Sequence, residues 1–196
     1  MRLKSIRRSV FAWTTGTALG LASWGVQAQS QSVPVFNDHS PTWYVQGAVA
    51  ENDAYSASLG TTVPWRQWTY GLGSGQVTGH WDLFASHWSS RRIDDGRQSS
   101  FVFGALPTLR WRADQGQSAW FAQVGTGLAL ANKRYQSVNK RFSTTYNFAT
   151  HLAVGANFGA QREHEVMLRV EHYSNAGLKK PNPGENFLQL RYARRF

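Results

Sequence analysis

Apolar residues alternate with small or polar ones through most of this sequence, and this period of two constrains the fold more than any other feature. In one stretch Val166, Leu168 and Val170 alternate with Arg169 and Glu171. Such alternation is typical of β-strands with one apolar face. Each repeat of the pattern is close to the ten or so residues that a tilted strand needs to cross a bilayer. The pattern recurs in eight segments, residues 42–50, 54–65, 75–88, 99–112, 118–131, 146–158, 164–175 and 186–196.

A soluble β-sandwich would show the same alternation, but three further features favour a membrane barrel. The chain ends inside its last strand at an aromatic residue, Phe196, as outer-membrane proteins of Gram-negative bacteria do. The links between segments alternate between short ones, at 113–117 and 160–163, and long ones, at 89–98, 132–145 and 176–185. Tyrosine and tryptophan gather near segment ends, as an interfacial girdle requires: Trp43, Tyr44, Trp65, Trp68, Tyr70, Trp88, Trp111 and Trp120.

No stretch after residue 28 is apolar for the roughly 20 residues that a spanning helix needs. A closed β-barrel is the other structure that can cross a bilayer, because it satisfies every backbone hydrogen bond internally. We therefore predict an all-β fold, an eight-stranded antiparallel transmembrane β-barrel of the outer membrane.

Residues 1–28 have the pattern of a secretory signal peptide, which leaves residues 29–196 as the barrel domain. A basic start that ends at Arg8 precedes an apolar stretch, residues 10–22, that is too short to span a membrane. Val26-Gln27-Ala28 then supplies small residues at the cleavage positions. The chain has no cysteine, which excludes disulfides and thiol nucleophiles. An exported chain of this kind fits the outer membrane of a Gram-negative cell after signal-peptide cleavage.

Several polar residues have the parity of the barrel interior. His80, Asp82 and Ser86 alternate on one face of segment 75–88, and His151 has the inward parity of segment 146–158. The residue types could form a catalytic triad. A narrow barrel needs polar side chains to fill its lumen, however, so we predict a hydrogen-bonded structural network for these residues.

Segment 164–175 carries polar residues on the face that should meet lipid. His172 and Ser174 continue the apolar row formed by Val166, Leu168 and Val170. Polar groups facing lipid are costly and therefore point to a function. Residues two apart on a strand lie about 7 Å apart, which leaning side chains can bridge. A serine activated by a histidine is the usual nucleophile and base of ester hydrolysis, so we predict this pair at the level of the outer leaflet.

The links predicted to face outward hold nine cations, and the overall net charge is +10. Phosphate groups of lipid A in the outer leaflet would suit such side chains, although ordinary solvated loop charge explains them equally well. Nucleic acid is a poor partner for a membrane-embedded barrel. The cations are Arg91, Arg92, Arg97, Lys133, Arg134, Lys140, Arg141, Lys179 and Lys180.

The twelve residues from Glu171 to Asn182, EHYSNAGLKKPN, closely resemble the signature of the lipid A 3-O-deacylase (PagL) family. A looser resemblance covers most of residues 29–196, including 75–82 and 148–158. It implies an eight-stranded outer-membrane barrel that hydrolyses the ester of a 3-hydroxyacyl chain at position 3 of lipid A, without metal or cofactor. The implied partner is lipid A or lipopolysaccharide of the outer leaflet, and a homodimer is left open.

The resemblance also implies roles for individual residues. His172 matches the general base and Ser174 the nucleophile. Asn175 and Asn182 match residues that shape the site, where amide or backbone N–H donors could form an oxyanion hole. Phe148 resembles an aromatic residue near the site.

The chain departs from the family at the residue that should orient the histidine. The family places a glutamate fourteen residues after the histidine, but this chain has Asn186 there and Glu185 one residue earlier. A shift of one residue on a strand turns a side chain to the opposite face. We expect Glu185 to orient His172 through local loop geometry, with Asn186 as the alternative.

The sequence as a whole therefore predicts a serine esterase acting on lipid A, with a lipid-facing Ser–His pair. Two other readings remain open from the residues. One is a non-enzymatic barrel, such as an adhesin or a structural protein. The other is an outer-membrane phospholipase or acyltransferase.

Overall fold

The computed structural model describes residues 38–196, apart from the side chain of Gln67. The predicted signal peptide, residues 1–28, lies outside the described residues. Within residues 38–196, no helix is long and apolar enough to cross a membrane.

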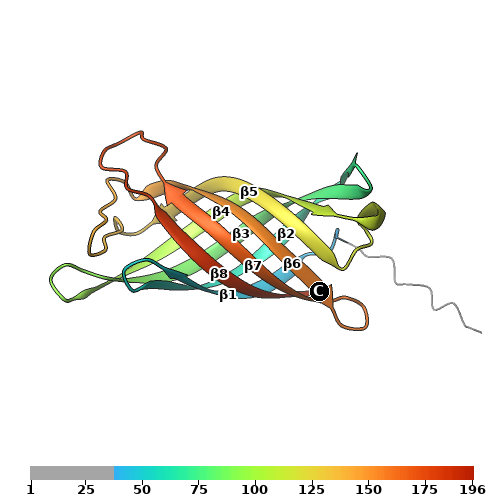
Figure 1. The fold of residues 1–196 in the computed structure, drawn as a ribbon, viewed down its shortest axis with the longest axis horizontal. Helices are drawn as coiled ribbons and strands as arrows, with labels where there is room; N and C mark the ends of the chain where they lie inside the picture. The colour runs from blue at the N-terminus through green and yellow to red at the C-terminus, as the bar shows by residue number, and fades with distance from the viewer. Residues whose placement is uncertain (1–37) are drawn as a thin grey trace, which may run out of the picture. The chain divides into compact units, whose positions relative to one another are not determined.

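Eight strands form a closed antiparallel barrel in which each strand pairs with its sequence neighbours and β1 closes on β8 (Figure 1). The predicted fold is thereby confirmed. We call the end that holds Pro41 and Phe196 the periplasmic end, and the opposite end the outer end. The strands are β1 (Thr42–Ala50), β2 (Ala54–Leu72), β3 (Gly75–Arg91), β4 (Arg97–Arg112), β5 (Trp120–Ala131), β6 (Tyr146–Phe158), β7 (His164–Ser174) and β8 (Glu185–Arg195).

The largest difference from the predicted segments is in β2, which runs seven residues past the expected end at residue 65. Its register with β3 is interrupted between Pro64 and Thr69, and pairing then resumes to Leu72. Proline cannot donate to the ladder, and a bulge at that point lets the two strands continue together. Gly73, with φ of +61°, supplies the tight turn into β3.

Alternation along the strands separates an apolar exterior from a polar interior. Large apolar side chains cover the outside, as expected for a barrel surrounded by lipid. Trp43, Trp68 and Trp120 are exposed, as a girdle requires. Tyr44 and Trp88 are not part of it, which corrects the prediction: both lie inside the barrel, because their parity is that of the inward-facing rows.

A layer of ionic groups fills the middle of the lumen. Asp82 accepts hydrogen bonds from Tyr44 (2.6 Å), Arg169 (2.6 Å) and Arg191 (2.9 Å). Arg169 also pairs with Glu171. The predicted interior network is therefore confirmed for Asp82. It does not extend to His151, whose two ring nitrogens have no hydrogen-bond partner among the described residues, or to Nε2 of His80.

No catalytic triad forms among the interior residues of β3. The Ser86 hydroxyl is bonded to that of Ser58 (2.8 Å) and not to His80 or Asp82. His80 and His151 are buried within the lumen, as their parity predicted.

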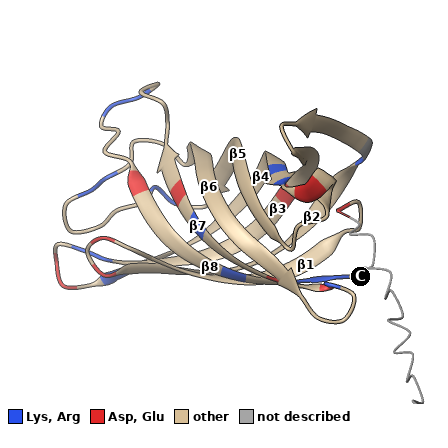
Figure 2. Cartoon of the chain, turned by 45° about the vertical axis from the view of Figure 1, so that its right-hand side comes forward, with Lys and Arg blue, Asp and Glu red and all other residues tan. Residues whose placement is uncertain are grey.

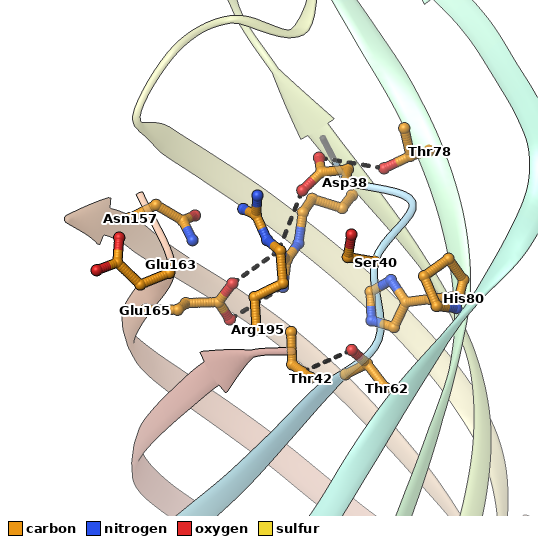
Figure 3. Close-up of a pocket in the computed structure, with 12 residues that line it drawn as sticks. Asp38, Ser40, Thr42, Thr62, Thr78, His80, Asn157, Glu163, Glu165 and Arg195 are labelled. Atoms are coloured by element: carbon orange, nitrogen blue, oxygen red, sulfur yellow. Dashed lines mark hydrogen bonds and ion pairs between the residues drawn. The ribbon is translucent and has the colours of Figure 1, made fainter. Parts of the chain in front are cut away.

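A second ionic group closes the periplasmic end around a cavity of ≈ 20 Å³, about the size of one water molecule (Figure 3). Arg112 contacts Asp38 (2.7 Å), while Arg110 contacts Glu165 (2.7 Å) and Asp38 (3.6 Å). Burial by itself would raise the pKa of Asp38, but the two guanidinium groups outweigh it and hold the pKa below its usual value. Asp38, just before β1, is thus held by ion pairs to two arginines of β4.

Candidate active site

β7 and β8 lie side by side in the barrel wall (Figure 1). Their outer ends hold four of the residues singled out from the sequence, His172, Ser174, Glu185 and Asn186. His172 of β7 lies directly opposite Asn186 of β8 in the strand register, and both side chains are exposed on the outside of the barrel. The Nδ1 of His172 and the Oδ1 of Asn186 are 2.8 Å apart. With the carbonyl oxygen of Asn186 facing the ring, Nδ1 is the donor of this hydrogen bond. In the neutral imidazole of this tautomer, Nε2 holds the lone pair that a general base needs.

Ser174, half-buried, is the last residue of β7 and lies two positions beyond His172 on the same face. Phe148 of β6 is directly opposite Ser174 in the register, so the two are cross-strand neighbours on the outer face. Within residues 38–196 no hydrogen bond joins the serine hydroxyl to the imidazole. Catalytic hydrogen bonds of this kind often tighten only when substrate is bound.

Glu185 does not reach His172, and the expectation that it orients the imidazole is wrong. Its carboxylate is fully buried inside the barrel, where it accepts hydrogen bonds from Tyr135 (2.7 Å) and Lys140 (2.8 Å). Strand β8 continues without a bulge at this point, so adjacent residues face opposite sides. Asn186, the alternative, contacts the ring.

Asn175 and Asn182 lie close together after β7, but they have different positions relative to the site. The Asn175 side chain is buried and donates to Ser143 (3.0 Å), Thr144 (3.3 Å) and the carbonyl of Lys179 (2.8 Å). It anchors loops rather than facing the serine. The Asn175 backbone N–H donates to Oδ1 of Asn182 (3.0 Å), which fixes the orientation of that amide. The Asn182 NH₂ group has no partner among the described residues and is left as a donor.

The loop between β5 and β6, residues 132–145, was predicted only as a source of rim cations, and its contacts at the outer end of the lumen were not foreseen. Lys140 contacts both Glu185 (2.8 Å) and Glu51 (3.1 Å). Burial alone would lower the pKa of Lys140, but these hydrogen bonds raise it above its usual value. Tyr135 packs against Trp88, with ring centroids 5.6 Å apart. Lys140 and Tyr135 thus attach this loop to the outer end of the lumen. Ser143 and Thr144 of the same loop accept hydrogen bonds from Asn175 and so attach it to the loop between β7 and β8.

Gly184 is a further residue that sequence reasoning missed. A Cβ added there would lie 2.6 Å from Cε1 and 3.2 Å from Nε2 of His172, and the backbone has φ of +68°. Both facts favour glycine at this position. The signal was present in the sequence as a Pro183-Gly184 pair directly before a strand.

Five of the nine predicted rim cations form no ion pair with any described residue, and all five lie on the loops that border His172 and Ser174. The other four are neutralised locally: Arg91 by Asp95, Arg92 by Asp94, Arg97 by Asp53, and Lys140 as above. Figure 2 shows basic residues without acidic ones on the loop between β7 and β8. The unpaired cations are Lys133, Arg134, Arg141, Lys179 and Lys180.

In residues 38–196 no group of three or more His, Asp or Glu side chains could hold a metal ion. The absence of a metal or cofactor in the reaction stays a prediction.

The profile of the lipid A 3-O-deacylase (PagL) family matches residues 53–195. The chain belongs to this family. It is 30% identical over 134 residues to lipid A deacylase PagL of Bordetella bronchiseptica, covering 64% of this chain and 70% of that protein. It is 28% identical over 134 residues to lipid A deacylase PagL of Pseudomonas aeruginosa, covering 68% and 74%.

Among solved structures, the fold matches a crystal structure of the outer membrane enzyme PagL with a TM-score of 0.67. The match has 22% sequence identity and covers 79% of this chain and 99% of that one. The resemblance stated from the sequence is confirmed by the family match, and family membership makes the chain an ester hydrolase.

Proposed function

We propose that this chain is a serine esterase of the outer membrane that removes the ester-linked 3-hydroxyacyl chain from position 3 of lipid A. The observation that carries the proposal is the hydrogen-bonded His172–Asn186 pair, which lies beside Ser174 on the lipid-facing side of the barrel. Family membership supports the choice of substrate. An acyl ester in the outer leaflet could reach Ser174 without leaving the membrane.

The proposed reaction uses His172 twice. Nε2 takes the proton of Ser174 as Oγ attacks the ester carbonyl carbon, and the same proton passes to the sugar oxygen when the ester bond breaks. Water then gives its proton to Nε2 and its oxygen to the acyl carbon, and Oγ recovers the proton as the free acid leaves. Asn186 holds the ring in the tautomer that both steps need.

The oxyanion that forms at each step needs donors already in place. We assign this role to the free NH₂ group of Asn182, since its own carbonyl oxygen is held by the Asn175 N–H. Asn175 contributes by fixing the loop and not through its side-chain amide. Phe148 lines the approach of the acyl chain.

The five unpaired rim cations are proposed to bind the lipid A phosphates. Charge-assisted contacts of Lys and Arg to phosphate are stronger than neutral hydrogen bonds. Because these cations lie on the loops beside Ser174, they would set the position of the sugar relative to the nucleophile.

Mass spectrometry of lipid A from a Gram-negative host that expresses the chain tests the proposal. The wild type should remove the mass of one 3-hydroxyacyl chain, Ser174→Ala should remove none, and Ser99→Ala, at an exposed serine of β4, should behave as wild type. Gain of an acyl chain would indicate an acyltransferase, and loss of phospholipid chains a phospholipase. If lipid A stays intact, purified protein with lipid A in detergent distinguishes a restrained enzyme from a wrong assignment.

A further inference from the structure

Two threonines interrupt the apolar outer surface of β5 and β6. Thr126 and Thr150 are exposed on the lipid-facing side, and their Oγ1 atoms are 2.8 Å apart. Within residues 38–196 this is the only hydrogen bond that either hydroxyl makes. The remaining outward residues of the two strands are apolar: Trp120, Ala122, Val124, Leu128 and Leu130 on β5, and Tyr146, Phe148, Leu152, Val154, Ala156 and Phe158 on β6.

The two threonines are continuous with the candidate active site. Thr126 is paired with Thr150, Thr150 with His172, and His172 with Asn186 in the strand registers. The four residues form one polar row across β5, β6, β7 and β8. The next outward row of the same four strands is entirely apolar: Val124, Leu152, Val170 and Leu188.

Packing alone does not account for the pair. Valine has nearly the shape of threonine and is the residue used at other outward positions, such as Val124 and Val154. A hydroxyl in contact with lipid is costly unless it is hydrogen-bonded. The shared hydrogen bond uses one of the two O–H groups, so a donor and several lone pairs stay free to bind a polar group of the lipid.

We propose that Thr126 and Thr150 bind the hydroxyl group on the third carbon of the acyl chain that is removed, and so make the enzyme selective for hydroxylated chains. The proposal rests on the proposed function. Acyl chains joined directly to the lipid A sugar carry this hydroxyl, and along the aliphatic part of the chain it is the polar group nearest the ester.

The position of Thr150 relative to Ser174 fits this role. Phe148 is directly opposite Ser174, and Thr150 is two residues further along β6 toward the periplasmic end. Such diagonal neighbours lie roughly 7–8 Å apart. An acyl chain attached at Ser174 runs in the same direction, into the bilayer. Its hydroxyl carbon is two carbons from the ester carbonyl. The side chains of Ser174 and Thr150, together with this short piece of the acyl chain, are long enough to span the distance between the two residues.

The test compares two synthetic glucosamine esters in detergent, one with a 3-hydroxyacyl chain at O3 and one with an unsubstituted chain of equal length. The ratio of their kcat/KM values is measured for the wild type, Thr150→Val, Thr126→Val and the double variant. Thr61→Val, at an outward threonine of β2 away from the site, is the matched control. The wild type and Thr61→Val should prefer the hydroxylated ester by roughly fivefold or more, as one net hydrogen bond provides. The preference should fall toward one in Thr150→Val and in the double variant.

An unchanged ratio in folded Thr150→Val and double-variant protein would overturn the inference and leave the threonines as a structural link between β5 and β6. If the wild type cleaves both esters, Ser174→Ala cleaves neither and the ratio does not move, the proposed function stands and this inference falls. If the wild type cleaves neither ester, both fall. A structural role alone would lower the unfolding temperature without changing the ratio.

Discussion

Replacing Asn186 tests the proposed catalytic arrangement most directly. Its bond to Nδ1 of His172 is 2.8 Å long. Such a bond contributes about 0.5–1.5 kcal/mol when the ring is neutral and about 1.5–3 kcal/mol when it is charged. Only the difference, about 1–1.5 kcal/mol, lowers the barrier, because the ring becomes charged as Ser174 attacks. Asn186→Leu should therefore reduce kcat by roughly 5- to 13-fold.

Asn186→Asp should act in the opposite direction. Aspartate has the same length as asparagine, so its carboxylate can accept the same hydrogen bond. A charge-assisted bond is roughly twice as strong as a neutral one. If the difference of about 1–1.5 kcal/mol between the charged and the neutral ring doubles in the same way, kcat should rise by about tenfold. The resemblance described from the sequence implies a carboxylate at this position, and this variant would restore one.

Glu185→Gln provides the contrast, since that carboxylate faces the lumen. It should lower the unfolding temperature, through weaker contacts with Lys140 and Tyr135, while kcat falls less than in Asn186→Leu. Release of the free acid from lipid A in detergent gives kcat, and unfolding is followed by the heat-dependent gel migration of the barrel. Unchanged kcat in both Asn186 variants would refute the reasoning, as would a loss in Glu185→Gln equal to that of Asn186→Leu at unchanged stability.

Three further predictions concern other parts of the molecule. Gly184→Ala should lower kcat while the variant stays folded, because the added Cβ displaces the His172 ring. A kcat equal to that of the wild type would show that the ring does not need this space. Lys179→Gln with Lys180→Gln should raise KM for bis-phosphorylated lipid A more than for the dephosphorylated form, measured at low salt, and an equal rise would remove the phosphate role. Asp38→Asn should lower the unfolding temperature at neutral pH; because the pKa of Asp38 is lowered by folding, the wild type loses this advantage as pH falls through that pKa, and the two curves should converge in acid rather than stay parallel.

Strand parity alone was sufficient to place most side chains. It put Asp82 and His151 inside the barrel and His172 outside, and the structure agrees with each. The same parity groups Asn186 with Leu188 and Leu190, on the outward face. The expectation for Glu185 was wrong because the residue type of the family was preferred over this geometric rule.

Parity also predicts that Tyr44 and Trp88 point into the barrel, as they do. They were assigned to the girdle because residue type was used in place of parity. It could not give the loop contacts. Lys140 and Glu185 are 45 residues apart, and the backbone between β5 and β6 is irregular, so no local pattern predicts that they meet. The same holds for the contacts of Asn175, which depend on two loops meeting in space.

The ionic layers inside the barrel have a consequence for the cell as well as for the fold. A strand number of eight gives a lumen only wide enough for side chains. In this chain Arg169 and Arg191 occupy its middle, and Arg110 and Arg112 its periplasmic end. These buried side chains make the lumen a packed interior and not an open channel. Lipid remodelling can proceed on its outer surface while the permeability barrier of the membrane stays intact.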